Sequence, residues 1–300
     1  MRRDINIRTL FPLPLRRGTI QFPLPLGERV RVRGVFNNEK GVALIITLLV
    51  VTLLTALIVE FAYSARVNLS SAGSFRDRQK AYYLAKSGVN FIGGMLKDNA
   101  SKNKADDINQ MIPPVTVGDG VVSLKAFDES AKINIKTINT NNVAKARLVR
   151  LFDIMEVSSQ LLDGIFERES YNLVSELRLV RGITDEIYDK IKDYLTVYGD
   201  GKININTAGE VVLRCLLNDI TEDIASRIIS YREKNRFENP ADLKKVVGVS
   251  QDFNISDIVT KSDYYSVIST GTVNEVDSTI EAVLQRSNKT NITKLYWRSQ

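Results

Sequence analysis

The sequence predicts an α+β fold in which one long N-terminal helix packs on an antiparallel sheet, with a large all-helical domain inserted into that sheet. Three observations predict this fold. A continuous apolar run leads into an amphipathic helical pattern, residues 138–258 carry helical signals separated by short turns, and alternating segments typical of strands lie on both sides of them. Strands that bracket a block of helices are typical of the α+β class.

Composition excludes several classes of protein. The net charge of +6 belongs to residues 1–34, which hold eight arginines and two acids, while the charges from Val35 onward balance. A neutral body has no broad positive field to attract nucleic acid. The chain has no histidine, which removes serine–histidine triads and the usual zinc ligands. Its one cysteine, Cys215, cannot form an internal disulfide, and we expect it to be a small buried apolar residue on a helix.

Residues 1–34 do not have the pattern of a folded segment. The motif FPLPL occurs at Phe11–Leu15 and again at Phe22–Leu26, and its four prolines prevent a long helix. One hypothesis is that this segment is an upstream non-coding repeat, translated from a wrongly chosen start, with the true start at Val35. The alternative is a disordered cytoplasmic tail.

An apolar run of 18 residues, Val42–Val59, predicts a transmembrane helix. At ~1.5 Å per residue it spans about 27 Å, enough to cross the hydrocarbon core of a bilayer. Its threonines can bond back to the helix, and no polar face interrupts it. Apolar residues then recur every three or four positions, so one helix is predicted over residues 42–98. Its inward-facing residues are Ala81, Leu84, Ala85, Ile92, Met95 and Leu96.

The residues before this run resemble a type IV prepilin leader, predicted over residues 35–41. An ordinary secretory signal is cut after its apolar core. Here Lys40 and Gly41 stand directly before the core. By this resemblance a peptidase cuts between Gly41 and Val42 on the cytoplasmic side, leaves the apolar helix in place, and N-methylates Val42.

The rest of the chain divides into a sheet and an insert. Residues 101–119 are expected to form a loop, and strands are predicted at 121–127, 133–135, 264–272, 279–285 and 292–297. The pattern predicts helices at about 141–155, 157–167, 171–180, 184–197, 208–217, 221–234 and 240–247. Thr207 to Glu210 has the sequence of a capping box, and Asn239 precedes a proline suited to the first helical position. The segments KINIKT at Lys132 and KININT at Lys202 repeat each other, each before a helix.

These motifs together resemble one family. A leader ending in Lys-Gly, the strand ending with DESAKINI, the segment VSELRLVRG from Val174 and the segment KININTAGEVVL from Lys202 are similar to the K subunit of the general secretion pathway. This is the atypically large minor pseudopilin of type II secretion systems. The resemblance covers residues 35–300. It implies a pilin-like domain made of residues 99–137 and 259–300, with a SAM-like or helix-hairpin-helix-like domain inserted at 138–258.

The resemblance also implies a function. The family caps and initiates the periplasmic pseudopilus in a tip complex with the I and J subunits, for protein export across the outer membrane. Ile46 occupies the fifth position counted from Val42, where pilin-like subunits generally carry glutamate. A carboxylate at membrane depth costs about 2.5–3.5 kcal/mol unless it has a partner, and a tip subunit has none above it. The implied location is the bacterial inner membrane, with a single span and the C-terminal domain in the periplasm. The implied partners also include the prepilin peptidase.

The sequence departs from the family in its acidic residues. Many K subunits have an Asp-Trp-x-Asp stretch before the ELRLV segment, whereas only Asp163 remains here. Calcium is therefore implied by the resemblance alone, since calcium prefers six or more oxygen ligands and no dense carboxylate cluster is visible. Asp128 and Glu129, then Glu222 and Asp223, are the nearest pairs. The simplest interpretation is that both pairs are solvated acids of a turn and a helix start.

The sequence also has features of other classes of protein. Residues 205–249 resemble helix-hairpin-helix modules throughout, which makes a membrane-anchored DNA-binding protein the strongest alternative. The hairpin at Leu217–Asp223 has no glycine and three acids, and the hairpin at Arg181–Glu186 has two acids, so both would repel phosphate. An enzyme is not indicated, because no phosphate loop or nucleophile elbow is present. A generic signal-anchored structural protein is the remaining alternative, and it would be indifferent to the prepilin peptidase.

Overall fold

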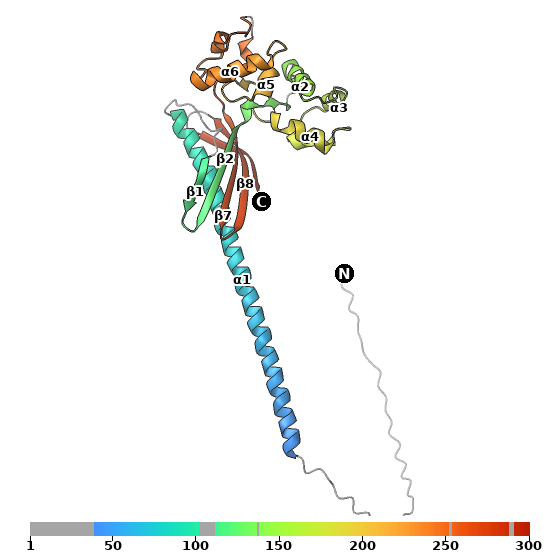
Figure 1. Cartoon of the computed structure of the whole chain (residues 1–300), viewed down its shortest axis with the longest axis vertical. Coiled ribbons are helices and arrows are strands. Elements are labelled where there is room, and N and C mark those ends of the chain that lie inside the picture. Colours follow the sequence, from blue (N-terminus) through green and yellow to red (C-terminus); the bar gives the residue numbers. More distant parts are fainter. Residues whose placement is uncertain (1–38, 102–111, 137, 252–253, 288–290) are drawn as a thin grey trace, which may run out of the picture. The chain divides into compact units, whose positions relative to one another are not determined.

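A computed structural model of the chain describes residues 39–101, 112–136, 138–251, 254–287 and 291–300 (Figure 1). Residues 1–34, and with them the hypothesis of a start at Val35, lie outside the described residues. The chain divides into two compact units, Met1–Ser64 and Ala65–Gln300. Helix α1 (Glu39–Ser101) contributes its first part to one unit and its second part to the other. The two units are described separately.

The first part of α1 is an exposed apolar helix, as predicted. Each large apolar side chain from Val42 to Val59 is at least 44% exposed. The three threonine hydroxyls, Thr47, Thr52 and Thr55, donate hydrogen bonds of 2.7–2.9 Å to carbonyl oxygens three or four residues earlier. A segment whose polar groups are all satisfied internally is suited to lipid. By length and composition, α1 is the helix among the described residues that could cross a membrane.

A five-stranded antiparallel sheet begins the second unit, in the order β1-β2-β7-β8-β9. Its strands are β1 (Ile112–Val117), β2 (Gly120–Asp128), β7 (Tyr264–Val273), β8 (Val276–Ser287) and β9 (Asn291–Ser299). The four strands other than β1 confirm the predictions. β1, which contains Pro113 and Pro114, lies where a loop was expected. Prolines are tolerated here since β1 is an edge strand whose register shifts between Ile112 and Val115.

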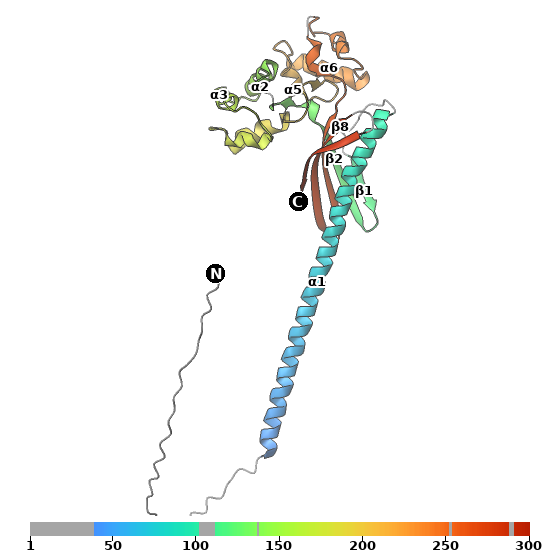
Figure 2. The ribbon, with the colours of Figure 1, turned by 180° about the vertical axis from the view of Figure 1, so that it is seen from behind.

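The second part of α1 lies along one face of this sheet (Figure 2). It buries a stripe of small and aliphatic residues, as predicted, while Leu84 and Met95 are half-buried at its margin. The members of the stripe are Ala81, Ala85, Val89, Ile92 and Leu96. The approach is close at Gly271 of β7, where an added Cβ would meet the carbonyl oxygen of Ala81 and lie 2.8 Å from the Ala85 nitrogen. The position accepts only glycine because the helix backbone occupies the space of a side chain.

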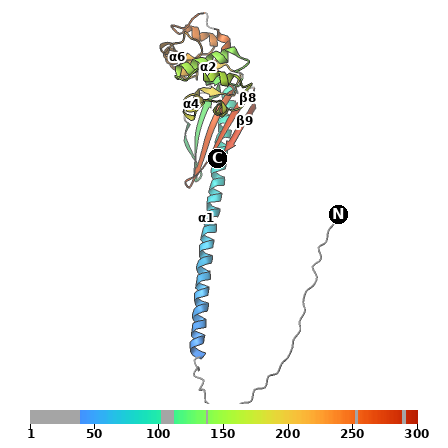
Figure 3. The same cartoon turned by 90° about the vertical axis from the view of Figure 1, so that its right-hand side faces the viewer.

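The inserted helices gather beyond one end of the sheet (Figure 3). They are α2 (Asn142–Ile154), α3 (Leu161–Phe166), α4 (Asp185–Ile191), α5 (Glu210–Arg214) and α6 (Glu222–Lys234). Two predicted helices are short 3₁₀ helices instead, η2 (Val174–Leu179) and η4 (Pro240–Lys245). The start of η4 carries the predicted cap, since Asp242 accepts from the Asn239 amide at 2.9 Å. The insert has its own apolar core, separate from that of the sheet.

The KINIKT and KININT segments open two structural repeats. β3 (Ile133–Asn134) pairs in parallel with β4 (Leu195–Thr196), and β5 (Ile203–Asn204) pairs in parallel with β6 (Ile258–Val259). Between its two strands the first repeat has three α-helices and two 3₁₀ helices, and the second has two of each; in both, the first 3₁₀ helix is followed by a glycine with positive φ, Gly182 or Gly248. The side chain of each strand asparagine accepts from the amide two residues later, at 2.8 Å in the first repeat and 3.1 Å in the second. The sequence echo is therefore an echo of structure.

Replacing Gly271 by alanine should lower the free energy of unfolding by about 1–3 kcal/mol, the usual penalty for overpacking. Gly94→Ala is the matched control, because an added Cβ there meets nothing within 4 Å. It should raise stability by up to ~1 kcal/mol through helix propensity. Thermal unfolding of the full chain in detergent measures both. An unchanged midpoint for Gly271→Ala would show that α1 and β7 are not in backbone contact.

Candidate functional site

The sequence placed candidate site residues in two regions, the start of α1 and the turn after β2. Gly41, Val42 and Ile46 all lie in the first turns of α1. Val42 and Ile46 are 59% and 56% exposed, so their side chains are accessible to lipid or to another helix. Cleavage after Gly41 and methylation of Val42 remain predictions.

The turn after β2 is where the chain leaves the sheet for the insert. We call Asp128–Ser130, together with the returning segment Thr260–Asp263, the neck. Asp128 is 2% exposed and Glu129 4%, so the interpretation of these acids as solvated was wrong. They are buried because the insert begins immediately after them and folds back over them. The second acidic pair fits its interpretation, since Glu222 and Asp223 lie in the first turn of α6 and are exposed.

Asp128 joins β2 to the second repeat. Its Oδ2 accepts from Asn204 Nδ2 at 2.7 Å and from Thr207 Oγ1 at 2.6 Å, while its Oδ1 accepts from the Ser130 amide at 2.7 Å. The capping box predicted at Thr207 was wrong. The N-cap of α5 is Gly209, two residues after Thr207, and it makes no side-chain capping hydrogen bond. The threonine hydroxyl is directed to the buried carboxylate instead.

Glu129 joins the same strand end to the first repeat. Its Oε2 accepts a short hydrogen bond from the Thr196 hydroxyl of β4, and its Oε1 pairs with Lys132 Nζ at 2.8 Å. Thr196 also accepts from the Tyr198 amide at 3.1 Å, which fixes its side chain. Two consecutive carboxylates therefore each hold one of the two repeats.

Burial shifts the pKa of Asp128. Loss of solvent raises the pKa of its carboxyl above the usual value, although hydrogen bonds from Ser262, Thr207, Asn204 and the Ser130 amide oppose the shift. The donors around it are neutral N–H and O–H groups, which direct hydrogens at the oxygens that a cation would need. Among the described residues, no three acidic, cysteine or histidine side chains form a metal-sized group. The surroundings of Asp128 and Glu129 therefore do not suit calcium.

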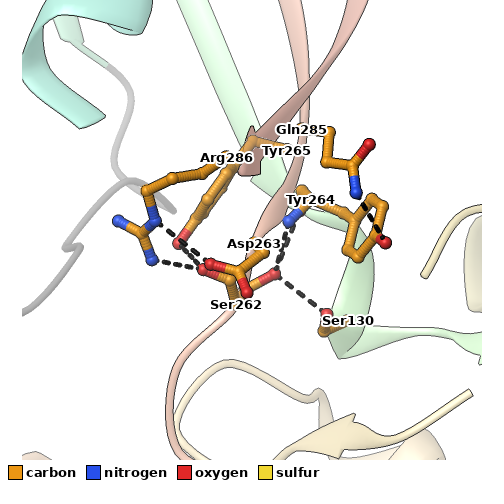
Figure 4. Close-up of polar contacts among 7 residues, drawn as sticks. All are labelled: Ser130, Ser262, Asp263, Tyr264, Tyr265, Gln285 and Arg286. Carbon is orange, nitrogen blue, oxygen red and sulfur yellow. Dashed lines mark hydrogen bonds and ion pairs between the residues drawn. The ribbon is translucent and has the colours of Figure 1, made fainter. Parts of the chain in front are cut away.

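The returning segment of the neck is held from three elements (Figure 4). Ser262 is 2% exposed, and its hydroxyl lies 2.9 Å from the Ser130 hydroxyl on the outgoing segment. Its carbonyl oxygen accepts from the Tyr265 hydroxyl at 2.9 Å and from the guanidinium of Arg286 on β8. Arg286 also pairs with Asp263 at 3.2 Å. The sequence signalled none of these contacts. Most of them join residues that are distant in the chain, and the Tyr265–Ser262 contact belongs to no recognisable motif.

Three arginines stabilise the interior of the insert by binding carbonyl oxygens. Arg147 reaches Gly201 at 2.7 Å and Asp257 at 3.2 Å, and is 3% exposed. Arg150 donates to the carbonyl oxygens of residues 215 and 216, just after α5, and Arg232 donates to those of residues 205 and 208. These contacts join helices and loops without a disulfide. The thiol of Cys215 is buried, as predicted, and burial raises its pKa to about 12.

The comparisons with known proteins agree with this fold. Residues 203–261, which span the second repeat, match the family model of type II secretion system protein K. A chain in the crystal structure of the GspK–GspI–GspJ complex from the type 2 secretion system of enterotoxigenic Escherichia coli has the same fold, with a TM-score of 0.66 and 16% identity. The match covers 77% of this chain and 99% of that chain. No curated protein sequence matches.

The fold thus defines a class, α+β proteins in which a long N-terminal helix packs on an antiparallel sheet that carries an inserted helical domain. Within that class, the predicted resemblance to the protein K family is confirmed by the match of residues 203–261 to the family model, and the shared fold over 77% of the chain agrees with it.

Thr207→Asp tests the assignment of Thr207 to the neck. Aspartate is as good an N-cap as threonine, so a capping role predicts little change. The observed geometry places a second carboxylate beside Asp128, and an unpaired buried charge should cost on the order of 3 kcal/mol of stability. The loss should shrink as pH falls, because like charges raise the folded-state pKa and one proton then neutralises the pair.

The control is Thr221→Asp, since Thr221 is a true N-cap that accepts from the Ile224 amide at 3.4 Å. This variant should retain wild-type stability in the same chemical denaturation assay. Combining Thr207→Asp with Asp128→Asn should restore most of the loss. Equal stability of the two threonine variants at neutral pH would contradict the assignment.

Proposed function

We propose that this chain is a minor pseudopilin of a type II secretion system, which caps the periplasmic pseudopilus and starts its growth. The single observation that carries the proposal is the combination of an exposed apolar helix, a pilin-like sheet and an inserted helical domain. A chain in the GspK–GspI–GspJ complex matches this fold over 99% of its own length and 77% of this chain. The role is that of a scaffold, and no step of catalysis is required of it.

In this role the first part of α1 acts twice. Before assembly, Val42–Val59 holds the subunit in the inner membrane, with the second unit in the periplasm. During assembly the same apolar surface packs against the helices of neighbouring subunits, since an exposed apolar helix needs either lipid or protein around it. Aromatic residues at the end of the apolar run, Phe61 and Tyr63, are 76% and 66% exposed and are suited to the membrane–water interface.

The position at the tip is supported by Ile46 and by the insert. An apolar residue at this depth avoids the cost of a carboxylate that has no neighbour above it to pair with. The insert occupies the end of the sheet, where it would obstruct the addition of a further subunit. The partners we propose are the equivalents of GspI and GspJ, the proteins that accompany GspK in the similar structure.

DNA binding by the helix-hairpin-helix-like insert is the less favoured function. The hairpin before α6 keeps its acids, and Glu222 and Asp223 are 73% and 66% exposed at their side chains. Exposed carboxylates at a helix start repel phosphate at the place where such modules bind it. Retention of the chain on DNA at low salt, with loss at high salt, would be needed to revive this alternative.

Processing by the prepilin peptidase tests the proposal. Co-expression with the enzyme should give a mature chain that begins at Val42, because the cut lies on the cytoplasmic side of the apolar helix. N-terminal sequencing and intact mass would measure the cut and an added methyl group. Gly41→Leu should remain uncut, whereas Gly73→Leu, at a glycine of α1 where an added Cβ meets nothing within 4 Å, should be cut normally. An intact leader in the unaltered chain would reject the prepilin assignment.

Assembly tests the position at the tip. Co-expressed with the I and J subunits of its own secretion system, the processed chain should co-purify with both in a complex of one copy each. A tagged J subunit, analysed by size-exclusion chromatography with light scattering, gives the composition. Recovery of J and I without this chain would contradict the proposed partners while leaving the processing result intact.

A further inference from the structure

The neck joins two bodies that do not share an apolar core. The core of the sheet and α1 includes Val89, Ile92 and Val267, and the core of the insert includes Leu148, Leu177 and Leu243. Domains joined through a small interface usually move relative to each other unless that interface is large and hydrophobic. An insert reached by two chain crossings would therefore be expected to swing on a hinge.

The composition of the neck argues against a hinge. Most of its polar side chains are buried, with Asp128, Glu129, Ser130 and Ser262 each no more than 8% exposed, whereas Lys261 and Asp263 are exposed. Hinges are a few loop or element-terminal residues that can absorb changes in φ and ψ, and the packing around these buried side chains opposes such changes. Among the described residues, three buried side-chain polar atoms have no hydrogen-bond partner, and none of them belongs to the neck. A buried polar network in which every member is satisfied rigidifies the structure around it.

The geometry also blocks rotation in more than one direction. Asp128 holds the second repeat through Asn204 and Thr207, and Glu129 holds the first repeat through Thr196. The Ser130–Ser262 contact ties the outgoing segment to the returning one. Because these attachments reach different segments of the insert, turning the insert on the neck would break at least one buried hydrogen bond.

The returning segment is anchored to the sheet as well. Arg286 is 8% exposed on β8, and its backbone amide donates to the Asp263 carbonyl at 2.7 Å. Its guanidinium and the Tyr265 hydroxyl converge on the carbonyl oxygen of Ser262, as Figure 4 shows. Breaking these contacts would leave the buried Ser262 carbonyl and the buried Arg286 guanidinium without these hydrogen bonds, which is unfavourable.

We propose that the neck is a rigid coupling, in which Asp128 and Ser262 act as positioning residues that fix the insert relative to the sheet. The two bodies then move as one, and a force applied to the insert passes to β2, β7 and α1. This inference does not depend on the proposed role in secretion. It would fail independently of the processing and assembly experiments.

Distances between spin labels in the full chain test the coupling. Labels on introduced cysteines at Ser123 of β2 and Ser226 of α6 report the position of the insert, since both positions are exposed. Native Cys215 can remain, because it is fully buried and its pKa is raised to about 12. Pulsed electron–electron double resonance in detergent should give one narrow distribution of distances between the two labels. A native distribution as broad as that of a flexible linker would overturn the proposal.

Variants of the neck sharpen the test. Asp128→Ala should at least double the width of the distance distribution, and Ser262→Ala should broaden it to a smaller extent. The matched control, Asp277→Ala, removes an exposed acid from the opposite end of the sheet and should leave the width unchanged. Should Asp128→Ala fail to fold, Ser262→Ala and Thr207→Val remain as milder variants. A folded neck variant with the native width would show that other contacts fix the insert.

Discussion

The pairing of β2 with β7 is the constraint on which the rest of this structure depends. Asp128 at the end of β2 lies opposite Tyr265 at the start of β7, although the whole insert separates them in sequence. This register brings the outgoing and returning segments side by side. The sheet can close only if the insert returns to within one strand spacing of its departure, so both repeats must fold compactly between two fixed points.

A buried carboxylate at this point has two consequences. It is unfavourable by itself, because burial disfavours the charged form and raises the pKa of Asp128. It is also specific, since only an arrangement that supplies Asn204, Thr207 and the Ser130 amide together satisfies it. An apolar residue there would tolerate many orientations of the insert. A charged acceptor penalises all orientations except one, and specificity of this kind is the best general reason to retain a buried polar group.

The sequence predicted what depends on periodicity. The continuous helix, the alternation in β2 and the KINIKT echo were all visible, because neighbouring residues determine them. It failed where a distant residue decides the outcome. Thr207 has the sequence of a cap, but Asp128, brought close by the fold, takes its hydroxyl. Pro113 and Pro114 argue against a strand until the sheet places them at its edge. The acids of the neck look solvated until the insert covers them.

The two units of the chain make opposite use of exposed and buried groups. In the first part of α1, apolar side chains remain exposed, so this unit is incomplete without lipid or another helix. In the neck, most polar side chains are buried and hydrogen-bonded within the chain. In the proposed role, the contacts of α1 change from lipid to neighbouring helices while the link between sheet and insert stays the same. A subunit in that role requires both an exchangeable apolar surface and a fixed insert. Weak, exchangeable apolar contacts suit the first requirement, and directional buried hydrogen bonds suit the second.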